Sequence, residues 1–440
     1  MMKSRLISIW DALRASYWFV PTLMSVGAVA LSIGALKVDA RLGLTGAREI
    51  GWLWAGGPDG ARSILSTIAS SMITVAGVVF SITIVALTLA SSQFGPRLLR
   101  NFLRDSINQV VMGTFVATYL YCLLVLREVK SVAEQAPFVP YLSVTVAIAL
   151  TTASLAMLIL YIHHIARSIG AETLVANVAA ELRESLHSLF PEQIGESKSA
   201  PAAREAGKAE PEERTPVLAP RGGYIQAIEG DTLLAFASEK ALVVHLLRRP
   251  GDFVPEGARL AEVWPPQRVD DEAQATVVDA HLIASSRTPR QDAEYCINQL
   301  VEIALRALSP GINDPFTAIS CVHWLGDALG FAAQREMPAP HRADEKGVVR
   351  VIAKVSSFQG LADAALNGIR QYGASNPAVA IAMLQVIGEI APRVTRPEDR
   401  QTLLRHAEAI FEDAMARSPN AGDAADMQTH RDSVCRLYAA

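Results

Sequence analysis

The stretch from Ser63 to Pro96 contains no charged residue, and it constrains the fold more than any other part of the chain. A helix needs about 20 apolar residues to cross the hydrocarbon core of a bilayer. Residues 64–92 offer about 29, which is roughly 43 Å at the helical rise of 1.5 Å per residue. The stretch therefore predicts a membrane-spanning helix that is longer than the bilayer requires.

Small hydroxyl side chains recur along one side of this predicted helix, most of them at seven-residue intervals: Thr67, Thr74, Ser81, Thr88 and Ser92. In lipid, such residues let helix backbones approach closely and share hydrogen bonds. Alternatively, they line a water-filled path, because hydroxyls replace part of an ion's hydration without a fixed charge. No carboxylate or lysine lies within the predicted spans, which argues against a proton-coupled transporter.

Four segments have the length and apolar composition of membrane spans, at about 17–36, 64–92, 107–126 and 138–162. The first is longer than the core of a cleaved signal peptide, which favours an uncleaved span. The N-terminal tail carries Lys3, Arg5 and Arg14. A basic tail and an even number of spans predict that both termini lie in the cytoplasm, with the protein in the inner membrane.

The composition excludes several functional classes. Charged residues make up 19% of the chain and the net charge is −4, so nothing indicates a nucleic-acid partner. The four cysteines form no CxxC pair and the histidines show no ligand spacing, so we expect no metal site and no cofactor. No nucleophile elbow, P-loop, HExxH or dinucleotide motif is present, so we do not expect an enzyme.

Three arginines follow the long span at helical spacing, Arg97, Arg100 and Arg104. One interpretation is an interfacial anchor that binds lipid phosphates. The other is a ring of positive charge around the cytoplasmic mouth of an oligomer, which would favour anions.

The chain divides into five predicted parts: a transmembrane domain at 1–165, a helical extension of the fourth span at 166–190, a flexible linker at 191–220, a small β module at 221–268 and a helical domain at 269–440. The linker is rich in Pro, Ala, Glu and Lys and cannot bury enough apolar area to fold alone. The β module has the strands GYIQAI, ALVVHLL and ARLAEVW and resembles a small barrel or sandwich.

Seven amphipathic helices are predicted beyond the β module, at 270–284, 289–308, 315–333, 347–372, 376–392, 397–416 and 421–438. Polar residues gather around the second of them: Arg287, Gln291, Asp292, Arg306, Asn313 and Asp314. They either cap helices, with Asn313 or Asp314 before Pro315, or form a ligand or subunit contact.

Two motifs, SITIVALTLASSQFGPRLLRNFLRD and RALSPGINDPFTA, together with the four predicted spans, resemble the bacterial membrane proteins grouped as domain of unknown function 2254. The resemblance covers nearly the whole chain. It implies an integral membrane protein and supplies no activity and no functional residues.

The sequence thus predicts an α-helical integral membrane protein with four transmembrane helices, followed by a soluble α+β region made of a barrel-like module and a helical bundle. The leading functional hypothesis is a homo-oligomeric ion channel or pore in which residues 64–92 line the path and the C-terminal region regulates it. The alternative is a non-conducting scaffold or sensor that binds a partner or small ligand, and a membrane enzyme is a third possibility. The expected partners are the lipid bilayer, further copies of the chain and small ions.

Overall fold

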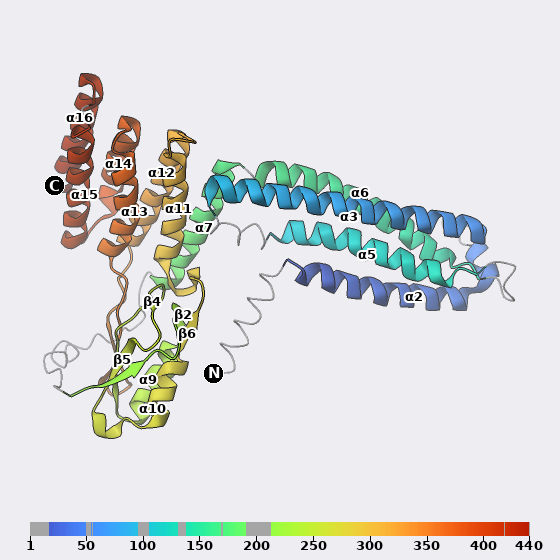
Figure 1. The fold of residues 1–440 in the computed structure, drawn as a ribbon, viewed down its shortest axis with the longest axis horizontal. Coiled ribbons are helices and arrows are strands. Elements are labelled where there is room, and N and C mark those ends of the chain that lie inside the picture. Colours follow the sequence, from blue (N-terminus) through green and yellow to red (C-terminus); the bar gives the residue numbers. More distant parts are fainter. Residues whose placement is uncertain are drawn as a thin grey trace. The chain divides into compact units, whose positions relative to one another are not determined.

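The computed structural model describes residues 17–49, 54, 56–95, 105–130, 138–168, 170–190, 213–417 and 419–439. The contacts divide the chain into two compact units, one that ends at Gly170 and one that comprises Ala171–Ala440. Figure 1 shows long helices in the first unit and a mixture of strands and helices in the second.

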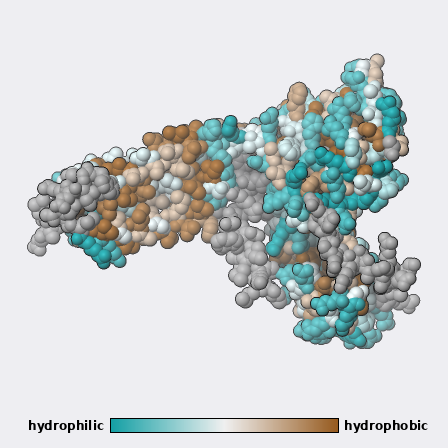
Figure 2. All heavy atoms as spheres, turned by 180° about the vertical axis from the view of Figure 1, so that it is seen from behind, coloured by the Kyte–Doolittle hydropathy of each residue, from teal (hydrophilic) through white to brown (hydrophobic). Residues whose placement is uncertain are grey.

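Four long helices form the described part of the first unit: α2 (Phe19–Glu49), α3 (Pro58–Phe94), α5 (Ser106–Glu128) and α6 (Tyr141–Ser168). They arise where the sequence has long runs of apolar and small residues without an interior proline. Each is long and apolar enough to cross a membrane. Figure 2 shows hydrophobic side chains gathered over the outer surface of this unit.

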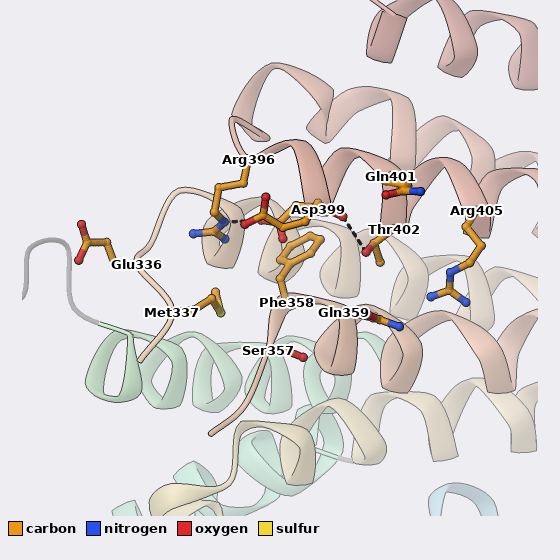
Figure 3. A pocket seen from close by; sticks show the side chains of 11 residues that line it. Glu336, Met337, Ser357, Phe358, Gln359, Arg396, Asp399, Gln401, Thr402 and Arg405 are labelled. Atoms are coloured by element: carbon orange, nitrogen blue, oxygen red, sulfur yellow. Dashed lines mark hydrogen bonds and ion pairs between the residues drawn. The ribbon is translucent and has the colours of Figure 1, made fainter. Parts of the chain in front are cut away.

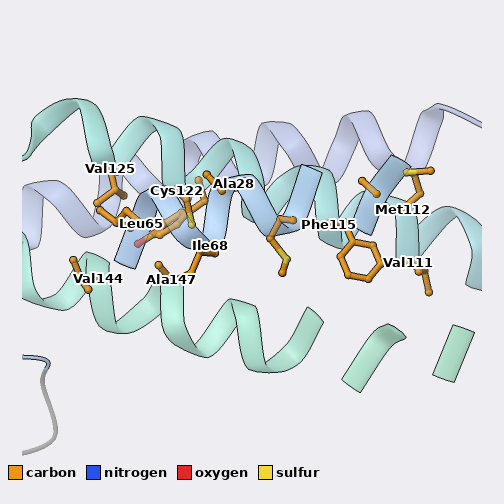
Figure 4. Packing of buried hydrophobic residues seen from close by; sticks show 14 of the residues in the cluster. Ala28, Leu65, Ile68, Val111, Met112, Phe115, Cys122, Val125, Val144 and Ala147 are labelled. Atoms are coloured by element: carbon orange, nitrogen blue, oxygen red, sulfur yellow. The ribbon is translucent and has the colours of Figure 1, made fainter. Parts of the chain in front are cut away.

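Helix α5 lies at the centre of this unit, in contact with α2, α3 and α6. Half of its most apolar stretch is buried (50%), compared with 22% for each of the other three helices. Its buried side chains, Phe115 and Cys122 among them, belong to one apolar cluster with Leu65 and Ile68 of α3 and Val144 of α6. In Figure 4, Cys122 lies beside Leu65 and Ile68, and Phe115 lies farther along the bundle. The core of the unit therefore surrounds α5, and large apolar surfaces of α2, α3 and α6 remain uncovered by the described chain.

The second unit begins with α7 (Ala171–Leu189), which packs against two helices of the C-terminal bundle. From its helical periodicity, we predicted that this region continues the helix of the fourth span. The periodicity is confirmed, but the continuous helix is wrong, because α6 ends at Ser168 and α7 begins separately at Ala171.

The β module contains two sheets rather than a barrel. The five-stranded sheet has the order β1 (Thr215–Leu218), β5 (Arg259–Trp264), β3 (Val243–Leu246), β8 (Val349–Ile352) and β7 (His341–Ala343). The three-stranded sheet has the order β4 (Phe253–Val254), β2 (Gly223–Ile228) and β6 (His281–Ala284). Helices α9 (Gly230–Glu239) and α10 (Asp271–Asp279) pack against the strands.

Three sequence boundaries in this module need correction. Residues 215–218 belong to strand β1, so the predicted linker does not extend to residue 220. The predicted helix 270–284 ends at Asp279 and is followed by β6. Residues 349–352, predicted as the start of a helix, form β8, which pairs with the distant β3 in parallel.

Six helices complete the second unit: α11 (Ala293–Ala307), α12 (Pro315–Ala333), α13 (Phe358–Gly373), α14 (Pro377–Ile390), α15 (Pro397–Met415) and α16 (Ala421–Ala439). Helix α12 is a fifth helix with the length and composition of a membrane span. Half of its apolar window is buried (50%), against α11, α14 and α7.

Gly326 brings α12 and α14 into close contact, because a Cβ atom at this position would overlap the side chain of Val386. We expect Gly326→Ala to lower the free energy of unfolding by about 1–3 kcal/mol through overpacking. Gly388 of α14 is the matched control, because its added Cβ would lie 3.6 Å from Leu437, an ordinary contact. Gly388→Ala should be neutral or stabilising by up to about 1 kcal/mol. Thermal unfolding of both variants measures the difference, and equal effects would contradict the close packing.

Candidate functional site

Helix α3 has two different faces. The face turned toward the bundle is buried and apolar, with Ala61, Leu65, Met72, Ala76 and Val79 all less than a tenth exposed. The opposite face carries the predicted stripe, and all five of its members are exposed: Thr67, Thr74, Ser81, Thr88 and Ser92. The close packing inside the chain therefore uses alanines and larger apolar residues, not the hydroxyl stripe.

Most hydroxyls of the stripe are satisfied within α3. Thr67 donates to the carbonyl oxygen of Ser63 at 2.7 Å, and Thr74 and Thr88 donate to the carbonyls four residues earlier at 2.8 Å. Ser81 makes no side-chain hydrogen bond to any described residue. Apart from Ser81, these hydroxyls thus need no partner to satisfy their hydrogen bonds, but the stripe presents a polar, small-residue surface on the outside of an apolar bundle.

Apolar side chains share the exposed half of α3 with the stripe, including Ile73, Val78, Ile84 and Val85. At about 100° per residue, the stripe drifts by about 20° per heptad around a straight helix. If several copies of α3 packed side by side in a left-handed supercoil, the stripe would stay at the interface between them along its whole length. The three arginines that follow the stripe in the sequence lie outside the described residues: Arg97, Arg100 and Arg104.

A buried carboxylate beyond the predicted end of the first span lies inside the first unit. Asp39 of α2 is 7% exposed and caps the N-terminus of α6. Its two carboxylate oxygens accept hydrogen bonds from the backbone N–H groups of Leu142 and Ser143, at 2.8 and 2.9 Å, and from the Ser143 hydroxyl. The helix α2 continues past the predicted end of the first span, which brings Asp39 to this position.

Further polar contacts join the helices. Tyr161 of α6 lies 2.8 Å from the Thr83 hydroxyl of α3, and Thr118 of α5 lies 3.2 Å from Ser154 of α6. His164 of α6 contacts Asp105, which also accepts from the backbone N–H of Ile107 and so caps α5. These contacts link α3, α5 and α6, and hydrogen bonds between helices stabilise their relative positions in an apolar medium.

The six residues predicted to form a cytoplasmic contact separate into two groups. Arg287, Gln291 and Asp292 lie before α11, whereas Arg306, Asn313 and Asp314 lie at or beyond its other end. A helix of 15 residues separates them, which corresponds to about 22 Å. The structure therefore does not bring the six into one site.

The first group has structural partners. Asp292 is 5% exposed, pairs with Arg287 at 2.7 Å and caps α11 by accepting from the N–H of Tyr295. Burial raises the pKa of Asp292 above its ordinary value, and Arg287 opposes this shift. Gln291 completes the edge of β2, because its amide accepts from and donates to the backbone of Ile228.

In the second group, the predicted cap of α12 is confirmed. Asp314 accepts hydrogen bonds from the backbone N–H of Thr317 at 3.1 Å and from the Thr317 hydroxyl. Asn313 adopts a positive φ of 50° at the turn. Arg306 lies 3.7 Å from Glu302, one helical turn earlier.

A cavity of about 830 Å³ lies in the second unit, between the first turns of α13 and α15. Arg396 and Arg405 lie toward its two ends, and Asp399, Phe358 and Gln359 lie between them (Figure 3). The sequence analysis did not single out these residues, because they come from segments that are far apart in the chain and carry no motif. Among the described residues, no group of three or more His, Cys, Asp or Glu side chains is placed to hold a metal ion.

These features define a membrane protein with several apolar helices and a mixed α/β C-terminal region. The chain belongs to the family described as "Predicted membrane protein (DUF2254)", whose model matches residues 14–389. It is similar to an uncharacterized protein of Mycobacterium tuberculosis, MT1328, and to one of Mycobacterium bovis, Mb1321c. Each is 34% identical over 437 residues, which cover 96% of this chain and 82% of the relative. No solved structure matches the chain significantly.

Asp39 should contribute more to stability than an exposed carboxylate at the start of a helix. We expect Asp39→Ala to lower the free energy of unfolding by about 2 kcal/mol, because two backbone N–H groups and one hydroxyl lose their acceptor. Asp59, exposed in the first turn of α3, is the control, and Asp59→Ala should cost no more than about 1 kcal/mol. Thermal unfolding in detergent gives both values; equal losses would mean that the interhelical cap is not formed.

Asp314 is expected to act as a cap and not as an ion-pair partner. Asp314→Asn should then be nearly neutral, whereas Asp314→Ala should cost about 1 kcal/mol of unfolding free energy. Melting curves of the two variants and the wild type decide the matter. If Asn proved as damaging as Ala, the charge itself would be needed, and Arg306 would be the first partner to examine.

Proposed function

We propose that this protein is an oligomeric membrane channel or pore in which α3 lines the conducting path and the C-terminal unit regulates it. The observation that supports the proposal is the position of the hydroxyl stripe, which lies on the face of α3 that no other described helix of the chain covers. An apolar helix surface suffices for contact with lipid, so a continuous polar stripe there favours contact with water or with other copies of α3.

We further propose four membrane spans, α2, α3, α5 and α6, with both termini in the cytoplasm and the protein in the inner membrane. The packing of α12 supports this count, since that helix contacts α11, α14 and α7 of the second unit. It also carries Asp327, which pairs with Arg183 at 2.8 Å and with Arg393 at 3.2 Å. The basic N-terminal tail supports the orientation.

Replacement of Ser81 distinguishes a conducting stripe from a packing surface. If copies of α3 surround a pore, Ser81→Leu should abolish ion flux and leave the oligomer intact, because a hydrophobic constriction closes a pore by dewetting. Thr152→Leu is the matched control, since Thr152 is exposed on α6 and donates to a backbone carbonyl of its own helix. It should change neither flux nor assembly. Flux is measured in proteoliposomes, and assembly by the elution volume.

Two outcomes would contradict the channel. Ser81→Leu that weakens assembly would indicate a packing surface between subunits, because the larger side chain separates the helix backbones. A wild-type protein that stays assembled and passes no ion at any potential would indicate the scaffold.

In a conducting protein, Arg100→Glu should shift selectivity away from anions if Arg97, Arg100 and Arg104 surround the mouth.

The second candidate function is a non-conducting scaffold or sensor whose C-terminal unit binds a small ligand. The observation that favours it is the cavity between α13 and α15, which is within the size range of small-molecule sites. The first candidate gives the C-terminal unit a regulatory role, and the second gives it a binding role.

A further inference from the structure

The most exposed large apolar side chains of the described chain lie in the second unit and not on the membrane helices. Phe316, in the first turn of α12, is 81% exposed, and Tyr372, near the end of α13, is 68% exposed. In the first unit the highest value is 67%, at Val85. Ile312, in the turn before α12, is also exposed. Apolar side chains that are this exposed at one place on a soluble surface indicate an interaction site.

Ile312, Phe316 and Tyr372 share one end of the helical bundle, and we call them the apolar end patch. A Cβ atom added to Gly373 would lie 3.5 Å from the side chain of Leu308, so the end of α13 meets the turn that follows α11. Tyr372 directly precedes Gly373, and Ile312 and Phe316 follow Leu308 in the sequence. Figure 1 shows the turn between α11 and α12 at the same end of the bundle as the turn between α13 and α14.

The backbone of the turn before α12 is suited to surroundings that contain little water. The N–H groups of Ile312 and Asn313 both donate to the carbonyl oxygen of Ser309, at 3.0 and 2.9 Å. The N–H group of Asp314 donates to the carbonyl oxygen of Ala307 at 2.7 Å. The two prolines of the turn have no N–H group. Most donors of the turn are therefore satisfied without water, as an apolar medium requires.

The patch lies at the end of the second unit where the chain enters from the first unit. Helix α7 runs parallel to α12, because Arg183 pairs with Asp327 at 2.8 Å and the carbonyl oxygen of Phe190 accepts from Arg335 at 3.2 Å. The partners are 144 residues apart in the first contact and 145 in the second. The same offset places the start of α7 level with the start of α12, and therefore at the end of the bundle that carries the patch.

The connection to the first unit keeps this end close to a membrane helix. Only residues 169 and 170 separate α7 from α6, which has the length and composition of a membrane span. Three steps between consecutive Cα atoms cover at most about 11 Å. A surface that is tethered near its target meets it at a high effective concentration, so even a small patch is able to dock.

The size and composition of the patch favour lipid over a second protein surface. A buried aromatic side chain covers about 150–250 Å², and by this measure the exposed parts of the three residues amount to about 400 Å². A stable protein interface buries about 800 Å² on each partner. Insertion into a bilayer surface has no such minimum, and aromatic and aliphatic side chains are typical of segments that enter the headgroup region.

We propose that the apolar end patch docks on the lipid surface of the membrane that holds the first unit, with Ile312, Phe316 and Tyr372 in the headgroup region. This contact is additional to the membrane spans. It gives the motif RALSPGINDPFTA a role as the docking turn. The proposal does not depend on whether the protein conducts ions, since docking is measured without flux.

The test uses the full-length protein in liposomes with a bimane fluorophore attached at Ser375→Cys. Ser375 is exposed in the turn after α13, so the label leaves the patch unchanged. Cys435 is replaced by Ser, and the other three cysteines are buried. Lipids with a doxyl group on the acyl chain should quench the label, and aqueous iodide should not. A label at Gln274→Cys, exposed on α10 of the β module, should show the opposite pattern.

Variants assign the quenching to the patch. Phe316→Ser and Tyr372→Ser should each shift the equilibrium between docked and free states about tenfold, and the double variant about a hundredfold, because large apolar side chains leave the lipid. Phe253→Ser is the matched control, since Phe253 is an exposed aromatic residue on β4 of the β module. It should leave the quenching unchanged. All three side chains are exposed, so the melting temperatures should stay close to that of the wild type.

Three results would overturn the proposal. A label at Ser375→Cys that iodide quenches and lipid does not would show that this end stays in water. Protection from both quenchers would show that protein covers the patch, for example another copy of the chain. Lipid quenching that persists unchanged in the double variant would show that the tether alone brings the turn close to the membrane, without docking of these side chains.

Discussion

The packing of three apolar helices around α5 determines most other features of the N-terminal unit. Helix α5 contacts α2, α3 and α6, and half of its apolar window is buried. Gly113 allows the close approach, since a Cβ there would lie 3.1 Å from the backbone of Pro21 and overlap Met24. Because α5 lies at the centre, one face of α3 packs in the core, and the hydroxyl stripe lies on the opposite, exposed face.

Polar residues in this unit are used in two different ways. Those between helices are paired: Asp39 with the start of α6, Thr83 with Tyr161, and Asp105 with His164. Those on the outer face of α3 are paired only with their own helix backbone, as Thr67, Thr74 and Thr88 are. In an apolar solvent, the first kind fixes the helix arrangement, while the second kind tolerates lipid, water or another subunit. Experiments on the stripe must therefore alter side-chain size, as Ser81→Leu does, and not only remove a hydroxyl.

Local patterns predicted the long elements of this fold well. The helix predicted at 315–333 matches α12, and the strand GYIQAI matches β2, because periodicity and turn residues act over a few neighbouring positions. Strands β7 and β8 were missed because each has only three or four residues, and β8 is stabilised by pairing with β3, about a hundred residues earlier. Strand β1 was missed because Pro216 lies within it, at the edge of the sheet.

The candidate sites were predictable to different extents. The seven-residue spacing placed the stripe on one side of a helix, but only the packing around α5 determines that this side faces outward. Residues 287–314 looked like one polar cluster because they are close in sequence, yet α11 separates them by its whole length. The cavity shows the opposite case: Arg396 and Phe358 are distant in sequence and meet only because α13 and α15 pack together.

The composition of α12 does not by itself separate a membrane span from a helix packed in a protein core. Its apolar residues satisfy the same criteria as those of α2 and α5. In the second unit, however, neighbouring helices cover half of it, Gly326 fits against Val386, and Asp327 is bonded by two arginines. Protein side chains thus provide the apolar surroundings that lipid would otherwise supply. Helix α3, by contrast, has an uncharged stretch with a wide uncovered face, as expected for contact with lipid.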